Sequence, residues 1–299
     1  IYEGNFGLGN GSISYINTAA NEITQEIFQL ENERGLGDVV QSMQKIGDLG
    51  FIAINNSNKV EVVNYKDFSE QGVITNLPSP RFIVEGPENT AYVSVWGNGG
   101  QVKVINTTTL LITDSVMVGS GPEGMIYVDQ KLFVANSGAW DVDNNISVIN
   151  TLDHSIIKTI EVGYAPKQFV EDQDGNLWVI CSGAGSWSSI GEQASTLVQI
   201  DPISLEVVQE ITLFANLQPS GLGIDPTGTV LVIGGGYGVE GLYKIFVNNP
   251  LTPTTPDILG SFYGFNVDPA NGNIFAADAG DYSNTGMIYQ YDFLGVKLA

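Results

Sequence analysis

The chain has 299 residues, and its 33 acidic side chains against 11 basic ones give a net charge of −22 and a pI near 4.1. A field of this sign repels nucleic acid and anionic lipid, so we do not expect the chain to bind either. Cys181 is the only cysteine, which excludes a disulfide within the chain. Its apolar surroundings in the sequence favour a small buried side chain over a reactive thiol.

A sequence repeat of about 40 residues runs along the chain and is clearest in residues 122–163 and again from residue 166. Successive copies begin at Asp38, Pro80, Pro122, Pro166, Pro219 and Tyr263. The steps between these starts are 42, 42, 44, 53 and 44 residues. Four-stranded propeller blades repeat every ~40–45 residues, and each blade needs a neighbour to bury its faces. The repeat therefore predicts an all-β, seven-bladed β-propeller with four-stranded blades, forming one domain over residues 1–299.

The incomplete first blade is expected at the start of the chain, with strands at 1–3, 12–17 and 22–29. A complete blade has four strands, called A to D here, and in the fourth blade we predict them at 124–129, 132–136, 146–150 and 157–162. These runs are rich in β-branched and aromatic residues and are bounded by Gly, Asn, Asp or Pro.

The one long step between copies is explained by residues 184–195, a Gly/Ser-rich stretch that predicts an enlarged loop. The last blade stops at 295–299, inside a predicted strand D. Closing the sheets requires a strand A for the first blade. We expect this strand either after Ala299 or before Ile1.

Few side chains suit catalysis or metal binding. His154 is the only histidine and lies in a predicted C–D turn, where neither a Ser-His-Asp triad nor a transition-metal site can be assembled around it. Residues 141–145 resemble a calcium loop in composition, but no Gly or Glu follows in the required register. A solvated acidic loop is the favoured interpretation. We expect no enzyme activity, no catalytic residue, no metal and no cofactor.

Aromatic residues follow strand B in six of the seven predicted blades. They are Phe6, Trp96, Trp140, Trp187, Tyr237 and Tyr282. All B–C loops of a propeller emerge on one face, and loops on a rigid scaffold are common binding sites. These rings are therefore predicted to form a ligand platform around the mouth of the central channel. Packing of each ring on a neighbouring blade is the alternative for any single residue.

The connections between blades reach the same predicted face. Arg81, Glu123 and Lys167 each follow the proline that starts strand A, and cations are rare in this chain. These three residues are predicted to make polar contacts with a ligand. Ordinary pairing with a neighbouring carboxylate is the alternative.

Residues 132–138, 146–150 and 159–163 resemble the YVTN-type repeat of surface-layer and YncE-like seven-bladed propellers. The segments at 3–15 and 37–43 are similar to surface lipoproteins of gut Bacteroidetes, a group that includes proteins capturing vitamin B12 and other corrinoids for an outer-membrane transporter. The resemblance implies a cell-surface location, with a lipid anchor supplied by a segment outside this sequence. It also implies that the aromatic face holds a corrin ring.

The sequence as a whole predicts a non-enzymatic, extracellular, monomeric binding protein. Its ligand is expected to be a bulky small molecule, with a corrinoid as the best candidate. The alternative is a surface scaffold that binds a protein or a glycan and partners an outer-membrane transporter.

Overall fold

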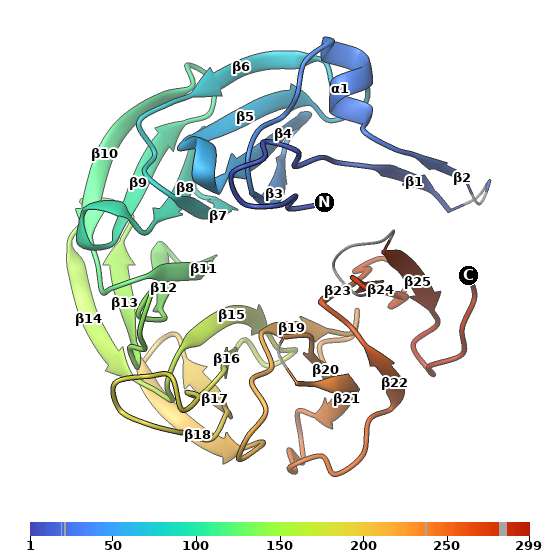
Figure 1. Cartoon of the computed structure of the whole chain (residues 1–299). Helices are drawn as coiled ribbons and strands as arrows, with labels where there is room; N and C mark the ends of the chain where they lie inside the picture. Colours follow the sequence, from blue (N-terminus) through green and yellow to red (C-terminus); the bar gives the residue numbers. More distant parts are fainter. Residues whose placement is uncertain (19, 21, 237, 281–285) are drawn as a thin grey trace. The chain divides into compact units, whose positions relative to one another are not determined.

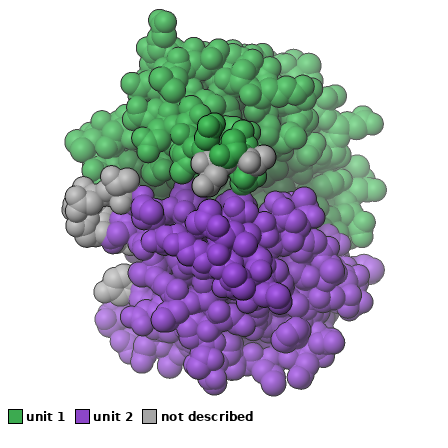
Figure 2. Space-filling model, turned by 90° about the vertical axis from the view of Figure 1, so that its right-hand side faces the viewer, with its two compact units in different colours: residues 1–134, 147–157 green, residues 135–146, 158–299 purple. Residues whose placement is uncertain are grey.

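The computed structural model describes residues 1–18, 20, 22–236, 238–280 and 286–299 (Figure 1). The chain is an all-β propeller built from four-stranded antiparallel blades. It divides into two compact units, coloured green and purple in Figure 2. Unit 1 comprises Ile1–Val134 and Ser147–Ile157, and unit 2 comprises Ala135–Ile146 and Lys158–Ala299.

Unit 1 holds two complete blades, each with its strands in chain order across the sheet. The first consists of β3 (Val40–Ile46), β4 (Leu49–Ile54), β5 (Lys59–Asn64) and β6 (Glu70–Ile74). The second consists of β7 (Pro80–Glu85), β8 (Thr90–Val95), β9 (Gln101–Asn106) and β10 (Leu111–Met117). One 3₁₀ turn follows strand B in each blade: η1 (Asn55–Ser57) and η2 (Gly97–Gly99).

The next blade contains residues of both units. Its strands are β11 (Pro122–Val128), β12 (Lys131–Asn136), β13 (Asn145–Asn150) and β14 (Ile156–Glu161). These bounds agree to within about two residues with the strands predicted for this blade from alternation and turn residues.

Unit 2 holds the remaining blades. One consists of β15 (Pro166–Glu171), β16 (Leu177–Cys181), β17 (Thr196–Asp201) and β18 (Glu206–Thr212). The next consists of β19 (Gly221–Ile224), β20 (Val230–Gly234), β21 (Glu240–Phe246) and β22 (Ile258–Ser261). The last has three strands, β23 (Gly264–Val267), β24 (Ile274–Asp278) and β25 (Met287–Tyr291), and Lys297 bridges to Tyr291 at the position of a fourth. The enlarged loop predicted at 184–195 lies between β16 and β17.

Seven blades were predicted, and this count is wrong: over the described part of the chain the structure has six. In the described part of the segment expected to form the first blade, the strands are β1 (Tyr15–Asn17) and β2 (Glu22–Thr24), which pair with each other in a two-stranded sheet, and Tyr2 and Ser12 form an isolated bridge. The strand predicted at 22–29 stops at Thr24, and the chain then enters helix α1 (Ile27–Asn32).

The apolar residues of this N-terminal segment cover the following blade instead of building a sheet of their own. Phe28 of α1 is 1% exposed and packs in one cluster with Ile13, Val40 and Ile52. Asn32 fixes the end of the helix, because its side-chain amide donates to the Phe28 and Phe68 carbonyls. The hairpin keeps Tyr15 and Ile23 about half exposed, so little free energy favours extending it.

The core lies along the middle strands of the blades. Every residue of β16 and β20 is buried, as is nearly all of β4, which explains their continuous apolar runs. The outer strands β6 and β18 are largely exposed, and Ile74 at the end of β6 is the one residue of the two strands that is buried.

Candidate ligand-binding loops

The start of strand A carries an irregularity that positions the predicted polar residues. The register shifts between Val40 and Ser42 in β3, between Pro80 and Ile83 in β7, and between Pro166 and Gln168 in β15. A bulge of this kind turns a side chain out of the regular alternation. It places Gln41, Arg81 and Lys167 at the end of their sheets where the B–C loops begin.

In unit 1, Arg81 joins two other predicted site residues. Its guanidinium contacts Glu123 through two bonds, Nε to Oε2 at 3.2 Å and Nη2 to Oε1 at 3.0 Å, a bidentate geometry. A third guanidinium nitrogen donates to Gln41, and the Trp96 ring centroid lies 4.2 Å from Cζ. The structure therefore brings Arg81, Trp96 and Glu123 into one cluster.

This cluster is largely withdrawn from solvent. The side chain of Arg81 is 16% exposed and that of Glu123 only 2%. Because the cation is held by a carboxylate and a ring, Arg81 shows the internal pairing that was weighed as the alternative to ligand contact. Arg81 therefore links Trp96 and Glu123 within the cluster.

Polar side chains near the ends of the B strands form hydrogen bonds to the next blade. Asn55 Nδ2 donates to the carbonyl of Pro80 at 3.2 Å, Ser94 Oγ to that of Glu123 at 2.8 Å, and Ser182 Oγ to that of Pro219 at 2.8 Å. Asn55 and Ser182 directly follow strand B of their blades and Ser94 lies near the end of its strand B, while each acceptor lies within two residues of the start of the next strand A. Since buried carbonyls require partners, these repeated side chains are accounted for by the fold.

In unit 2, Trp140 stands on the loop between β12 and β13 and is 89% exposed. The loop is braced from within: Asp141 N donates to the Gly138 carbonyl at 3.3 Å, and Asp143 N donates to the Ser137 carbonyl at 3.1 Å. Asn145 Nδ2 donates to the Asp143 carboxylate at 2.6 Å. The Trp140 ring is therefore exposed to water, while the backbone of its loop is held by hydrogen bonds.

Trp187 lies on the enlarged loop between β16 and β17 and is 62% exposed. Ala184 and Gln193 close the base of the loop with two backbone hydrogen bonds of 3.0 and 2.9 Å. Inside the loop, the Ser188 amide donates to the Gly185 carbonyl at 3.1 Å and its hydroxyl to the Gly191 carbonyl at 2.9 Å. The ring therefore sits at the tip of a closed, internally bonded loop.

The two tryptophan loops are joined to each other. Ser189 N donates to Asp141 Oδ1 at 3.1 Å, so the bond falls one residue after Trp140 and two after Trp187. Hydrogen bonds from the Ser189 side chain and backbone lower the pKa of Asp141 below its ordinary value. Lys167, the other predicted cation, lies in the same unit with its Nζ 3.3 Å from Ser137 Oγ.

Phe6 occupies a separate turn of unit 1 and is 78% exposed, with Leu8 beside it 68% exposed. Asp38 holds this turn, because its Oδ2 accepts the Gly7 amide at 2.9 Å. A hydrogen bond from the Asn56 side chain and others from the turn's backbone lower the pKa of Asp38. The two remaining predicted residues, Tyr237 and Tyr282, lie outside the residues that the structure describes.

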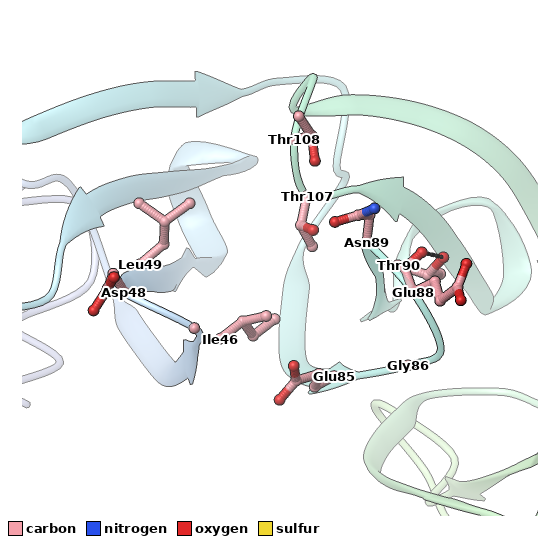
Figure 3. Close-up of a pocket in the computed structure, with 11 residues that line it drawn as sticks. Ile46, Asp48, Leu49, Glu85, Gly86, Glu88, Asn89, Thr90, Thr107 and Thr108 are labelled. Carbon is pink, nitrogen blue, oxygen red and sulfur yellow. Dashed lines mark hydrogen bonds between the residues drawn. The ribbon is translucent and has the colours of Figure 1, made fainter.

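Two pockets lie at the ends of the strands opposite the B–C loops. A pocket of about 510 Å³ in unit 1 is lined by the A–B turns of two blades, including Asp48, Glu85 and Glu88, and by Thr107 and Thr108 (Figure 3). A second of about 340 Å³ in unit 2 is lined by equivalent turns. The sequence analysis missed both, because the Gly-, Asn- and Asp-rich composition of these turns is also that of ordinary tight turns.

His154 pairs with a carboxylate on the rim of a blade. Its Nδ1 lies 2.7 Å from Asp114 Oδ2, and its ring meets Tyr92 edge-on at 6.3 Å between centroids. This contact lowers the pKa of Asp114. Across the described residues, no three His, Cys, Asp or Glu side chains are grouped as metal ligands. Within the same residues, no helix has the length and apolar character needed to cross a membrane.

The sheets and loops together define a β-propeller with exposed aromatic residues on its B–C loops. Residues 1–230 match the family described as a domain of unknown function (DUF5074), and the chain belongs to that family. No curated protein matches the chain.

Two solved structures share the fold. Hydrazine synthase of Kuenenia stuttgartiensis is 17% identical, with a TM-score of 0.71 over 93% of this chain and 88% of its own. A quinoprotein alcohol dehydrogenase-like protein of Bacteroides thetaiotaomicron is 14% identical, with a TM-score of 0.73 over 99% of this chain and 74% of its own. At these identities the likeness establishes the propeller fold and carries no activity across.

Proposed function

We propose that this protein is a non-enzymatic binding protein of the cell surface that captures a bulky, uncharged small molecule on its B–C loops. The observation that carries the proposal is the exposure of Trp140 and Trp187, 89% and 62%, on two loops that are joined by a hydrogen bond. Exposed rings add no burial energy to the fold, whereas ordered aromatic surface is what a ligand needs to gain binding energy.

A corrinoid is the leading candidate for the ligand. Its broad ring system has apolar faces and an edge of amides, which suits aromatic side chains surrounded by Ser, Gln and backbone amides. The chain's net charge of −22 favours an uncharged ligand over an anionic one. Delivery to an outer-membrane transporter and a lipid anchor belong to the same proposal, and they rest on the family resemblance.

Calorimetry with cyanocobalamin tests this function. Binding should release or absorb heat and raise the melting temperature, because a ligand that binds only the native state stabilises it. The Trp140→Ala and Trp187→Ala variants should bind more weakly. Ile203→Ala is a matched control, since Ile203 is 79% exposed but lies in a C–D turn. Absence of both heat and a melting shift at excess cyanocobalamin would refute the corrinoid assignment.

A surface scaffold remains a second candidate because of the Phe6–Leu8 turn. Two neighbouring apolar side chains, 78% and 68% exposed and pinned by Asp38, are typical of a protein–protein contact. A Phe6→Ser/Leu8→Ser double variant should then lose co-purification with a membrane transporter while it still binds cyanocobalamin. Retained co-purification would remove this candidate.

A further inference from the structure

The indole of Trp187 lies close against the backbone of a glycine in its own loop. A Cβ atom on Gly185 would lie 2.5 Å from Trp187 Nε1, 2.7 Å from its Cδ1 and 2.8 Å from Gln218 Nε2. The pyrrole edge of the indole therefore lies over the bare Cα of Gly185, with the Gln218 amide beside it. Because Trp187 is still 62% exposed, the rest of the ring is open to solvent.

The backbone next to Gln218 is also held in place. Its neighbour Pro219 is buried, and the Pro219 carbonyl accepts the Ser182 hydroxyl at 2.8 Å. Ser182 directly follows β16, the strand from which the Trp187 loop departs. An open aromatic face and an amide are thus fixed next to each other from two segments of unit 2.

We propose that Trp187, Gln218 and Trp140 form a binding site for a neutral carbohydrate chain. A pyranose ring has an apolar C–H face that stacks on an indole, and hydroxyls around its rim that hydrogen-bond an amide at the edge of that indole. Trp140, on the loop joined to the Trp187 loop by Asp141 and Ser189, provides a second ring for another sugar of the same chain.

The acidic residues of the Trp140 and Trp187 loops indicate whether the carbohydrate is neutral or charged. Residues 137–145 and 184–195 contain Asp141, Asp143 and Glu192 and no Lys or Arg. An anionic sugar would be repelled both by these groups and by the net charge of −22. The site therefore favours neutral chains. This inference uses the same Trp140 and Trp187 as the proposed capture of a corrinoid, but it goes beyond that proposal because it is argued from the placement of Gln218 and Gly185 at Trp187.

Nuclear magnetic resonance of the indole N–H groups tests the proposal, because the chain has only four tryptophans. Trp178 is an internal control: it is fully buried, and its Nε1 donates to Asp172 at 2.8 Å. Cellohexaose, xylohexaose, mannohexaose and maltohexaose are titrated separately to about 10 mM, since an open platform of this size is expected to bind with a Kd of about 1 mM. At least one should shift the Trp187 and Trp140 signals while Trp178 stays unchanged.

Three variants sharpen the test. Trp187→Ala should weaken binding of the active hexasaccharide at least about tenfold. Gly185→Ala keeps the tryptophan but places a methyl group where the indole lies, so it should also weaken binding. The backbone tolerates this change because Gly185 does not have a positive φ. Ile203→Ala, exposed at the other end of its blade, should bind as the unmodified protein does.

Hexagalacturonate, an anionic chain, should not shift the signals. The proposal is overturned if none of the four neutral hexasaccharides shifts Trp187, if Trp187→Ala binds unchanged, or if hexagalacturonate binds as tightly as the neutral chains. The cyanocobalamin calorimetry is a separate measurement on the same protein. A failure of the carbohydrate site is therefore distinguishable from a failure of corrinoid capture.

Discussion

Replacing Glu123 by Ala tests the interpretation that the Arg81 cluster is an internal support. In the native protein the Glu123 carboxylate, 2% exposed, holds the Arg81 guanidinium at 3.0 and 3.2 Å. After the substitution, Arg81 keeps the Gln41 side chain and the Trp96 ring, but it has lost its carboxylate in a site where its own exposure is 16%.

The expected loss of stability follows from this burial. Removing one partner of a buried ion pair costs about 3–5 kcal/mol, because the other charge stays desolvated. Because Arg81 keeps its contacts with Gln41 and Trp96, we expect the lower end of this range. We therefore expect a decrease of about 3 kcal/mol in the free energy of unfolding, or about 5 °C in Tm for a chain of 299 residues.

Thermal and urea unfolding followed by circular dichroism measure this change. An Arg81→Met/Glu123→Leu double variant should recover at least half of the loss, since no desolvated guanidinium remains. Lys158 and Glu206 are the control pair, with side chains 33% and 72% exposed, and Glu206→Ala should cost at most about 0.5 kcal/mol. If Glu123→Ala is as stable as that control, the reasoning from burial is refuted.

Three further predictions concern the loops and their support. Gly183→Ala should destabilise the protein by about 3 kcal/mol in urea unfolding, because φ is +77° and a Cβ would meet a backbone oxygen at 2.4 Å. Trp178→Phe should cost about 2 kcal/mol by the same assay, since Asp172 loses a buried hydrogen bond; an unchanged midpoint would contradict this. The pKa of Asp141 is lowered in the folded protein, so the charge-assisted bond from Ser189 has its full strength above the ordinary pKa of about 3.9 and weakens as pH falls through the lowered pKa. Tryptophan fluorescence should change across that acid range, and an Asp141→Asn variant, which can still accept the bond, should show no such change.

The propeller could be predicted from the sequence because the repeat sets both strand length and spacing. The structure has strands at Pro122–Val128 and Lys131–Asn136, as the alternation indicates. The blade count could not be predicted in the same way. Residues 22–29 contain apolar side chains suited to a strand, but Phe28 is buried in a helix against the next blade. Tertiary packing overrides local propensity in such short segments.

The Arg81 cluster could have been predicted more fully. Arg81 and Glu123 are 42 residues apart, the same as the step between their repeats, and side chains at equivalent positions of successive blades are neighbours. Opposite charges at such positions therefore predict an ion pair. The position of Trp187 over Gly185 could not be predicted, because it depends on how an irregular loop closes through Ala184 and Gln193.

Side chains of the repeat join the blades, whereas the exposed rings lie on irregular loops. This difference narrows where a ligand can bind. The Asn55, Ser94 and Ser182 side chains each donate a hydrogen bond to a carbonyl at the start of the next blade, so these donated bonds are already used in joining blades. Trp140 and Trp187 contribute little to the core, since most of each ring remains in water. Their loops are nevertheless braced and joined, which costs conformational entropy without burying the rings. An arrangement that orders apolar surface and leaves it exposed gains free energy only when a second molecule covers that surface.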